Sequence, residues 1–433
     1  MSIYGALLTG VAGLQAQSSA LSVSSANIAN VDTVGYKADD ANFETVLSST
    51  VGGTAGQTAV SEYNTQNVGQ QGLLQTATSP TDLAISGNGF FVTSTSPTST
   101  STQNYTRAGN FAADADGNLV NGSGNYLLGY PVNASGAATS SSLTPINIAN
   151  LSGQASESSA ISIQANLQSS STVDSTYAAG DMAKGKVTPD FTRTINVYDS
   201  QGGSQPLSFS FVETGANKWA YEVSYEGSSS NITGSNPIAT GTMTFNTDGT
   251  LANANSPTVP ATGNISVSIP WSAASGLSAQ TLSVDMGTVG ASNGITQFDS
   301  PSTLSGSTVN GALFGSLTGV SVNTNGYVSA QYSNGLTQMI YQIPLATFSN
   351  PNGLTPISGS AYSASQNSGV ATLNAPNTDG TGTIESSQLE SSNVDIDTEF
   401  SNLITTQNAY SAAARIVTTA NQMLQTLDEI PAT

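Results

Sequence analysis

The sequence predicts a mainly β protein with long α-helical termini. We expect two or three nested β domains plus a terminal helical coiled-coil domain formed by the N- and C-terminal segments. Three observations support this prediction. Apolar residues recur at heptad spacing at both ends of the chain. Apolar and polar residues alternate through the middle, and turn residues, many of them among the 43 glycines, separate the alternating segments.

The first predicted element is a helix over residues 2–30. Four apolar side chains recur every seven residues and form what we call the leucine stripe: Leu7, Leu14, Leu21 and Ile28. Fully burying one of them contributes about 1.5–3 kcal/mol, whereas ordering the backbone costs about 1–2 kcal/mol per residue. So few large apolar residues cannot order this helix alone. We therefore expect it to form only when several neighbours surround it.

The last predicted element is a helix over residues 394–430. Positions spaced alternately by four and three residues continue without a break: Ile396, Phe400, Leu403, Gln407, Tyr410, Ala414, Val417, Asn421 and Leu424. Asn393 is the expected N-cap. Asp395 and Asp397 lie near the helix start, where carboxylates interact favourably with the helix dipole. Two interpretations of the ends stay open: a coiled coil within one chain, or segments that are disordered in the monomer and fold within a polymer.

The sequence pattern in the middle of the chain predicts strands. Asp116-Gly117 and Asp248-Gly249 are hairpin-type turn signals. Residues 168–180, rich in Ser and Thr, are expected to form a linker between β domains. Five segments alternate with period two: residues 192–203, 206–213, 218–227, 240–253 and 264–271.

Helical segments at both ends favour a nested arrangement in which the termini meet. We expect a terminal helical assembly domain over residues 1–35 and 390–433, joined to the β domains by an extended connecting segment over residues 36–70. A first, discontinuous β domain is expected over residues 71–167 and 300–389. Residues 168–299 are expected to form an inserted outer β domain.

The composition excludes several classes of function. The chain has 7 Lys and Arg residues against 27 Asp and Glu residues, a net charge of −20, so no basic patch is available for nucleic acid or an anionic membrane surface. The absence of Cys and His excludes disulfides, thiolate chemistry and imidazole catalysis.

Residues 1–31 are not expected to be a signal peptide or a membrane span. A signal peptide needs a basic region, and the first basic residue is Lys37. Polar residues between Gln15 and Asn27 interrupt the run of roughly 20 apolar residues that a span requires. We expect no membrane insertion, and if the protein leaves the cytoplasm, we expect it to do so without a cleaved signal.

No motif in the sequence indicates an enzyme, a cofactor or a metal site. The sequence DADGN at residues 114–118 has its glycine fourth, where a calcium loop needs it sixth, so a β-turn explains it better. The sequence SGNGFF at residues 86–91 lacks the third glycine and the helix of a nucleotide loop, and predicts a tight turn into a strand. Asp395 and Asp397 would point to different faces of a helix, so they are not a catalytic pair.

Aromatic residues alternate on three of the predicted strands. A buried sheet face is the simplest explanation, and carbohydrate binding is the alternative. The residues concerned are Tyr198, Phe209, Phe211, Trp219, Tyr221 and Tyr225.

Both ends of the chain resemble the terminal signatures of bacterial flagellar axial proteins, the rod and hook family. The N-terminal signature ends in an Asn-x-x-Asn-x-x-Thr-x-Gly-aromatic-Lys run, here Asn27, Asn30, Thr33, Gly35, Tyr36 and Lys37. The C-terminal signature is matched by Ser392, Asn393, Val394, Asp395, Glu399, Phe400, Gln407, Tyr410, Leu424 and Leu427. Many relatives have Phe where this chain has Tyr36.

Internal blocks extend this resemblance over nearly the whole chain. Residues 70–92 and 105–130 are similar to the β domain shared by distal rod and hook members of the family. Residues 193–203, 218–223 and 342–354 look like the larger hook members. Residues 226–300 match only weakly.

The resemblance implies a structural subunit of the flagellar hook, a homopolymer that forms a flexible curved tube and transmits torque from rod to filament. It further implies export through the flagellar type III apparatus, contacts with rod, hook cap and hook-filament junction proteins, and an extracellular position in the flagellum. In the family the terminal helices pair. The implied subunit-assembly seam here comprises Leu7, Leu14, Leu21, Ile28, Phe400, Leu403, Tyr410, Val417 and Leu424.

Two other functions remain as alternatives. A distal rod subunit belongs to the same family, but the inserted outer β domain argues against it. A secreted β-rich adhesin or carbohydrate-binding protein would have no use for heptads at both ends.

Overall fold

The computed structural model describes residues 3–47, 58–98, 102–149, 151, 153–255 and 263–428. Contacts divide the chain into two compact units. The first unit comprises Met1–Leu151, Gly319–Gln331 and Thr337–Thr433, and the second comprises Ser152–Thr318 and Tyr332–Leu336. The described elements are mainly strands, with one long helix near each end of the chain, which confirms the predicted fold class. The finer domain boundaries stay predictions.

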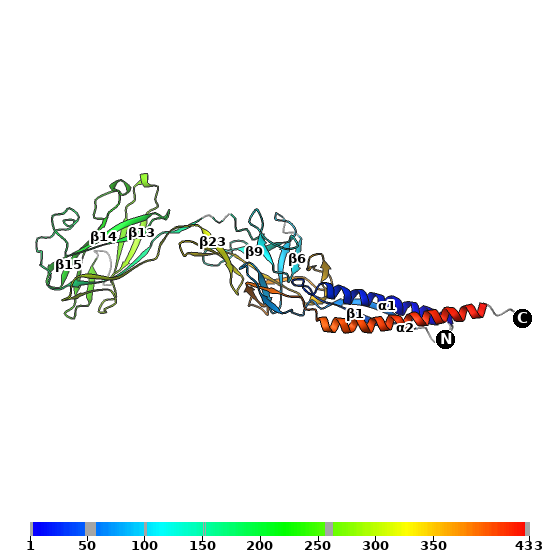
Figure 1. Ribbon diagram of the computed structural model, residues 1–433. Helices are drawn as coiled ribbons and strands as arrows, with labels where there is room; N and C mark the ends of the chain where they lie inside the picture. Colours follow the sequence, from blue (N-terminus) through cyan, green and yellow to red (C-terminus); the bar gives the residue numbers. More distant parts are fainter. Residues whose placement is uncertain are drawn as a thin grey trace. The chain divides into compact units, whose positions relative to one another are not determined.

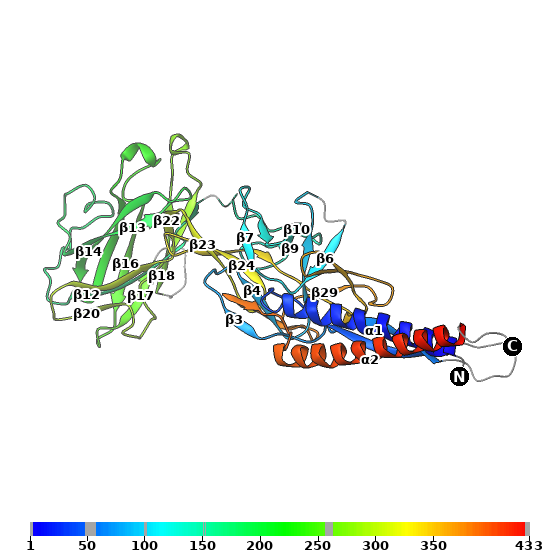
Figure 2. The same ribbon diagram turned by 45° about the vertical axis from the view of Figure 1, so that its right-hand side comes forward.

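Helices α1 (Ile3–Ala29) and α2 (Ile396–Asp428) lie side by side and antiparallel in the first unit (Figures 1 and 2). A Cβ atom on Gly10 would lie 2.9 Å from Cγ2 of Val417, and one on Gly13 would lie 3.8 Å from Cβ of Ala413. The absence of a side chain at Gly10 therefore allows the helices to approach closely. The buried residues of α1 are mostly small: Gly5, Gly10, Ala16, Ala20, Val23, Ser24 and Asn27.

Residues 36–70, expected to be an extended connecting segment, contain an antiparallel hairpin. Its strands β1 (Asp39–Leu47) and β2 (Thr58–Gln66) pair along their full lengths. Both strands contact α1. Ala12 and Ala16 of α1 line a small cavity together with Val60 and Ser61 of β2. Helix α1 therefore packs against the hairpin as well as against α2, which explains why so much of its buried surface is made of small side chains.

The largest sheet lies mostly in the first unit and has 13 strands. They are β5 (Phe90–Ser94), β6 (Gln103–Thr106), β7 (Phe111–Ala113), β8 (Leu119–Asn121), β9 (Tyr126–Pro131), β10 (Thr144–Pro145), β23 (Leu317–Val322), β24 (Tyr327–Tyr332), β25 (Thr337–Gln342), β26 (Leu345–Thr347), β27 (Thr355–Ile357), β28 (Ala361–Ser363) and β29 (Thr372–Asn374). Its main path is β23-β24-β25-β9-β5-β6-β28-β27. Phe90, Tyr105, Leu128 and Tyr362 contribute to a buried cluster on this sheet. A 3-10 turn, η3 (Pro351–Gly353), precedes β27.

Two small sheets tie the start of the first β region to the segment just before α2. Strand β3 (Leu74–Thr76) pairs with β31 (Gln388–Glu390), and β4 (Leu83–Ser86) pairs with β30 (Thr383–Ser386). Glu390 is thus the last residue of a paired strand and stands six residues before α2. Pairing in the sheet therefore fixes the position of Glu390.

The second unit is a two-layer β structure with one core. One five-stranded sheet contains β12 (Ala160–Gln168), β18 (Asn264–Ile269), β19 (Gln280–Asp285), β20 (Ile295–Phe298) and β21 (Thr303–Val309). The other has the order β13 (Phe191–Tyr198), β14 (Ser204–Gly215), β15 (Lys218–Tyr225), β16 (Ala239–Phe245) and β17 (Leu251–Asn255). The remaining elements are the pair β11 (Gln154–Ser156) and β22 (Ala312–Gly315), and the turns η1 (Ser229–Asn231) and η2 (Ala273–Ser275).

The core between these two sheets follows from period-two alternation. Along β18 and β19 every second residue is buried. The five predicted strand segments coincide with β13, β14, β15, the β16–β17 hairpin and β18. Five of the six alternating aromatic residues are buried in this core, and Tyr198 is half-buried. These rings therefore do not form an exposed surface on which a sugar could stack.

The linker predicted over residues 168–180 is wrong. Residues 174–187, which we call the strap, lie inside the second unit because they are bound to the sheet. The buried carboxylate of Glu222 accepts hydrogen bonds from the Tyr177 hydroxyl at 2.9 Å and from the backbone N–H groups of Gly180 and Ala183, both at 2.8 Å. A buried carboxylate with several donors is a strong local constraint, which composition alone did not reveal.

Asx-type turns recur in both units and account for five of the glycines with positive φ. In each, an Asn or Asp oxygen accepts backbone N–H bonds from the residues two and four positions later, and the residue three positions later is a glycine with positive φ. The predicted turn at Asp116-Gly117 is of this kind, with Asp114 as the acceptor, which agrees with the β-turn expected for DADGN. The Asn and Asp residues that begin these five turns are Asp114, Asn121, Asn133, Asp199 and Asn323.

We predict opposite effects for alanine at the two glycines of α1. Alanine favours helix over glycine by about 1 kcal/mol, so Gly13→Ala should increase protection of α1 amides from hydrogen exchange. Gly10→Ala should reduce it, because the new methyl group would meet Val417 at 2.9 Å. Adding Val417→Ala should restore protection. Equal gains for both single variants, measured by mass spectrometry, would show that the helices do not approach at Gly10.

We also predict that alkaline pH destabilises the second unit through Tyr221. Burial raises the pKa of its hydroxyl from 10.0 to about 12, so its contribution is fully present below pH 10 and is lost as pH rises toward 12. The loss amounts to about 2–3 kcal/mol of unfolding free energy. Urea unfolding followed by tryptophan fluorescence should show a smaller loss in Tyr221→Phe. The same pH dependence in both proteins would contradict this.

Candidate functional site: the junction of the terminal helices

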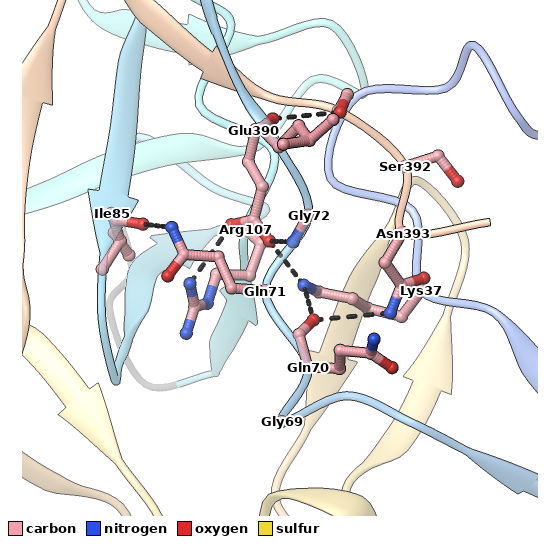
Figure 3. Close-up of polar contacts among 12 residues, drawn as sticks. Lys37, Gly69, Gln70, Gln71, Gly72, Ile85, Arg107, Glu390, Ser392 and Asn393 are labelled. Atoms are coloured by element: carbon pink, nitrogen blue, oxygen red, sulfur yellow. Dashed lines mark hydrogen bonds and ion pairs between the residues drawn. The ribbon is translucent and has the colours of Figure 1, made fainter. Parts of the chain in front are cut away.

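The residues that follow α1 and those that precede α2 meet at one place in the first unit (Figure 3). Residues 27–37 close α1 and lead into β1, whereas residues 390–399 leave β31 and enter α2. Because the helices are antiparallel, these segments lie at the same end of the helix pair. We call these two segments, together with Arg107, the junction.

Asn27 links both helices to β1 through a fully buried side-chain amide. Its Nδ2 donates to the backbone oxygen of Asp39 and to Oε1 of Glu399, both at 2.8 Å. Its Oδ1 accepts from the backbone N–H of Asp39 at 3.0 Å and from the Tyr36 hydroxyl at 3.2 Å. Only an amide side chain offers donors and an acceptor in this geometry, which is a physical reason for Asn at this position.

Glu390 is the centre of the junction, and its side chain is fully buried. Its Oε1 lies 2.5 Å from Nζ of Lys37 and accepts the backbone N–H of Gly72 at 2.7 Å. Its Oε2 accepts from Nη1 of Arg107 at 3.1 Å. A single carboxylate therefore joins the segment after α1, the β region and the segment before α2.

The two cations have further partners. Nζ of Lys37 also donates to the backbone oxygen of Gln70 at 2.5 Å, and Nη2 of Arg107 donates to that of Gly87 at 2.8 Å. The guanidinium of Arg107 lies 5.1 Å from the ring centroid of Phe90, a cation–π contact. Burial lowers the pKa of Lys37, and the Glu390 carboxylate opposes this effect.

Gly35 brings the chain into contact with the β region. Its φ is +67°, and its N–H donates to the backbone oxygen of Glu390 at 2.8 Å. A Cβ atom there would lie 2.6 Å from the backbone nitrogen of Ala108. Any side chain would therefore be strained and would also collide with backbone.

The N-cap expected at Asn393 is wrong. Its Oδ1 instead accepts the backbone N–H of Ala38 at 2.7 Å, so its side chain connects the two segments of the junction. The N-cap of α2 is Asp395, whose Oδ1 accepts from the backbone N–H groups of Asp397 at 3.0 Å and Thr398 at 3.2 Å. Asn393 and Asp395 both offer a short polar side chain, so the sequence pattern fits either as a cap, and the prediction named the wrong one.

Asn30 and Thr33 complete the turn after α1. Nδ2 of Asn30 donates to the backbone oxygen of Ala26 at 2.8 Å, a second hydrogen bond to a carbonyl that already accepts the backbone N–H of Asn30. The Thr33 hydroxyl donates to Oδ1 of Asn30 at 3.2 Å. Every residue of the N-terminal signature therefore has a hydrogen-bonding or steric role at the junction.

Models of four protein families match the chain. The model described as "Flagella basal body rod protein" matches residues 7–37, and "Flagellar basal body rod FlgEFG protein C-terminal" matches residues 385–430. These two matches contain both segments of the junction. "Flagellar hook protein FlgE/F/G D1 domain" matches residues 84–175, and "Flagellar basal body protein FlaE D2 domain" matches residues 166–312.

Full-length relatives decide the family. The chain is 32% identical to flagellar hook protein FlgE of Caulobacter vibrioides and 34% identical to that of Rhizobium meliloti, and each alignment covers 99% of both chains. The chain belongs to the flagellar hook protein family. A solved structure of flagellar hook protein FlgE2 from Helicobacter pylori is 15% identical, with a TM-score of 0.48, and covers 73% of this chain and 100% of that one.

In this flagellar hook family member the junction is a structural site. Its buried charges bind one another: the carboxylate of Glu390 pairs with Lys37 and Arg107 and so joins the two terminal segments to the β region. No group of three or more acidic side chains in the described residues is arranged to hold a metal ion. Neither helix, over the part that the structure describes, is long and apolar enough to cross a membrane.

The leucine stripe of this hook family member is not the most buried face of α1. All four of its residues are half-buried. Leu21 directly follows the buried Ala20, and one residue turns a helix by about 100°, so the stripe lies beside the buried face. On α2, Leu403, Val417 and Leu424 are half-buried, whereas the side chains of Phe400 and Tyr410 are 50% and 42% exposed. The proposed seam is therefore only partly covered within one chain.

Sequence reasoning missed the charged centre of the junction. Arg107 and Glu390 are 283 residues apart, and nothing local relates them. Their rarity was a usable signal, because only 8% of the chain is charged and Arg107 stands alone in a strand-like segment. A lone charge in such a segment is buried only when it is paired.

We predict that Glu390→Gln destabilises the first unit by about 3–5 kcal/mol, because it leaves Lys37 and Arg107 buried without a counter-charge. Hydrogen exchange should show loss of protection in β3, β31 and β4. Both tryptophans, Trp219 and Trp271, lie in the second unit, so the urea transition seen by their fluorescence should not move.

The matched control is Glu226→Gln, which removes the same charge from an exposed side chain of the second unit. It should change protection in neither unit by a measurable amount. Full protection of β31 in Glu390→Gln would mean that the carboxylate charge does not hold the junction together.

Proposed function

We propose that the chain is the structural subunit of a bacterial flagellar hook and that its copies polymerise into a flexible curved tube, which transmits torque from the rod to the filament. The observation that carries the proposal is identity of 32–34% with flagellar hook proteins over 99% of the chain. The proposed subunit is a structural protein, with no enzymatic activity and no cofactor.

The proposal includes a location and a set of partners. The subunit binds copies of itself along the tube, and rod, hook cap and hook-filament junction proteins at its ends. It is exported through the flagellar type III apparatus without a cleaved signal peptide and acts outside the cell. The basis for these finer points is the family resemblance of the two terminal signatures.

Exposed apolar side chains along both terminal helices support assembly through them. On α1, Tyr4 is 63% and Leu8 is 48% exposed, and on α2, Ile404 is 58% and Met423 is 53% exposed. Large apolar residues repeated along a surface indicate an interaction site. In the tube, neighbouring copies would cover these faces.

The proposed assembly seam combines the leucine stripe with Phe400, Leu403, Tyr410, Val417 and Leu424. Within one chain the small residues of α1 make the close contacts, which leaves the large residues of the stripe half-buried. Burial of the remaining apolar surface by other copies would supply free energy that a single chain lacks. This supports helices that reach full order only in the polymer.

A flexible tube also requires outer surfaces that can slide past one another. Only 8% of the residues in this chain are charged, so Ser, Thr, Asn and Gly cover much of its surface. Contacts between such residues are weak and interchangeable, whereas charge pairs would favour one register. This composition supports a tube whose subunits shift against one another as it bends.

The two alternative functions have less support. A distal rod subunit would not account for the match of residues 166–312 to the FlaE D2 family model or for hook proteins that align over the whole chain. A carbohydrate-binding protein would need exposed aromatic rings, but those that alternate on β14 and β15 are buried.

We predict that Leu21→Asp prevents tube formation and leaves the second unit intact. The new carboxylate would lie in the seam, where burying an unpaired charge opposes assembly. Purified full-length protein should form curved tubes, visible by electron microscopy, whereas the variant should not. Melting followed by tryptophan fluorescence should be the same in both.

Ser22→Asp is the matched control, because it places the same charge on the next residue, which is exposed. It should assemble at close to the normal concentration. Normal tubes from Leu21→Asp would show that Leu21 is not part of the seam. Failure of the unmodified protein to form any polymer would contradict the proposed function itself.

A further inference from the structure

A groove of about 440 Å³ lies between α1, α2 and β1 in the first unit. Part of its lining is apolar: Ala20, Val23, Ala41, Phe43 and Ala409. Phe43 is 47% exposed. The rest is polar and includes three carboxylates: Asp39, Asp40 and Glu399.

The carboxylates of the groove are poorly compensated. The amide of Asn27 donates to Glu399, but no ion pair within the described residues involves Asp39 or Asp40. Burial and the neighbouring Asp40 both raise the pKa of Asp39. A cation placed in the groove would relieve this repulsion.

The first unit has one basic side chain to offer. Of the seven Lys and Arg residues in the sequence, Lys184, Lys186, Arg193 and Lys218 belong to the second unit. Lys37 and Arg107 are buried against Glu390. The remaining basic side chain of the first unit is Arg415. It is exposed on α2 and forms no ion pair with a described carboxylate.

The groove runs along α2 as far as Ala409, but Arg415 is too far from its carboxylate end, where Glu399 lies, in the same chain. It lies 16 positions after Glu399 on the same straight helix, which corresponds to about 24 Å at 1.5 Å per residue. An arginine side chain cannot span this distance. The carboxylate end of the groove and this cation can therefore meet only between two copies.

The surface around Arg415 also suits the apolar part of the groove. Ile416 is 51% exposed and Met423 is 53% exposed on the same helix. This segment of α2 is thus basic and apolar, whereas the groove is acidic and apolar. The two surfaces are complementary in charge and in character.

We propose that residues 415–423 of α2 from one copy dock into the groove of a neighbouring copy, with the Arg415 guanidinium beside Asp39 and Asp40. The inference rests on the proposed function, since it concerns contacts within the polymer. In this arrangement the helix pair of each copy binds a defined surface of the next copy, and the repeated contact runs in one direction along the tube. Assembly driven by this contact weakens with added salt.

The absence of cysteine allows a direct test. Asp40→Cys and Arg415→Cys are combined in one chain, tubes are formed under reducing conditions, and the tubes are then treated with a short bis-maleimide crosslinker. A contact through an arginine side chain keeps the Cα atoms farther apart than the roughly 7 Å that a disulfide requires, so the crosslinker replaces the length of that side chain. It is too short to join the two cysteines of one chain. We expect a ladder of dimers and larger species on a non-reducing gel. Each single-cysteine variant should give no ladder.

Charge exchange provides the second test, which does not depend on the cysteine variant forming tubes. Asp40→Arg and Arg415→Asp should each raise the protein concentration needed for tubes by at least about tenfold. The double variant should recover most of this loss. Lys218→Glu, in the second unit, is the control and should assemble normally.

The outcomes separate the two proposals. Tubes without a crosslinked ladder, single charge variants that assemble normally, or a double variant no better than the singles would each overturn docking of Arg415 while leaving the hook function in place. Absence of tubes from the unmodified protein would instead contradict the proposed function.

Discussion

A single buried carboxylate, that of Glu390, is the interaction on which the first unit depends. It binds Lys37 just after α1, Arg107 in the β region and the backbone of Gly72. Desolvating three charges is costly, and the pairing offsets only part of this cost, since Nε of Arg107 is buried without a hydrogen-bond partner. The cluster therefore adds little net stability. Its main effect is to fix where the chain leaves α1 and where it enters α2. Asn27 and Glu399 extend the same constraint into the helices themselves.

The second constraint is steric and concerns α1. Gly10, Ala16 and Ala20 let this helix lie close to α2 and to the hairpin β1–β2, so it contacts two neighbours at once. Small side chains contribute little burial free energy, and the larger leucine stripe stays half-exposed. A helix built in this way is positioned within its own chain, and the proposed assembly would bury the rest of its apolar surface against further copies. The junction then transmits the position of the helix pair to the β region.

The sequence predicted the fold class well because periodicity is a local property. The heptads located α1 and α2, and alternation located β13 to β18. It did not predict which face of α1 is buried, because the heptad rule assumes a pair of helices and takes no account of the hairpin. The signature residues of the junction came from the resemblance, yet Glu390 and Arg107 were missed because their pairing spans 283 residues. The strap was taken for a linker because its anchor, Glu222, lies on a strand distant in sequence.

The most direct measurement is the structure of the assembled tube by electron cryomicroscopy at side-chain resolution. The account predicts that Glu390 still binds Lys37 and Arg107 in every subunit, that Gly10 still faces Val417, and that neighbouring copies cover the leucine stripe. Helices that have separated from each other, or a leucine stripe that faces solvent throughout the tube, would contradict it.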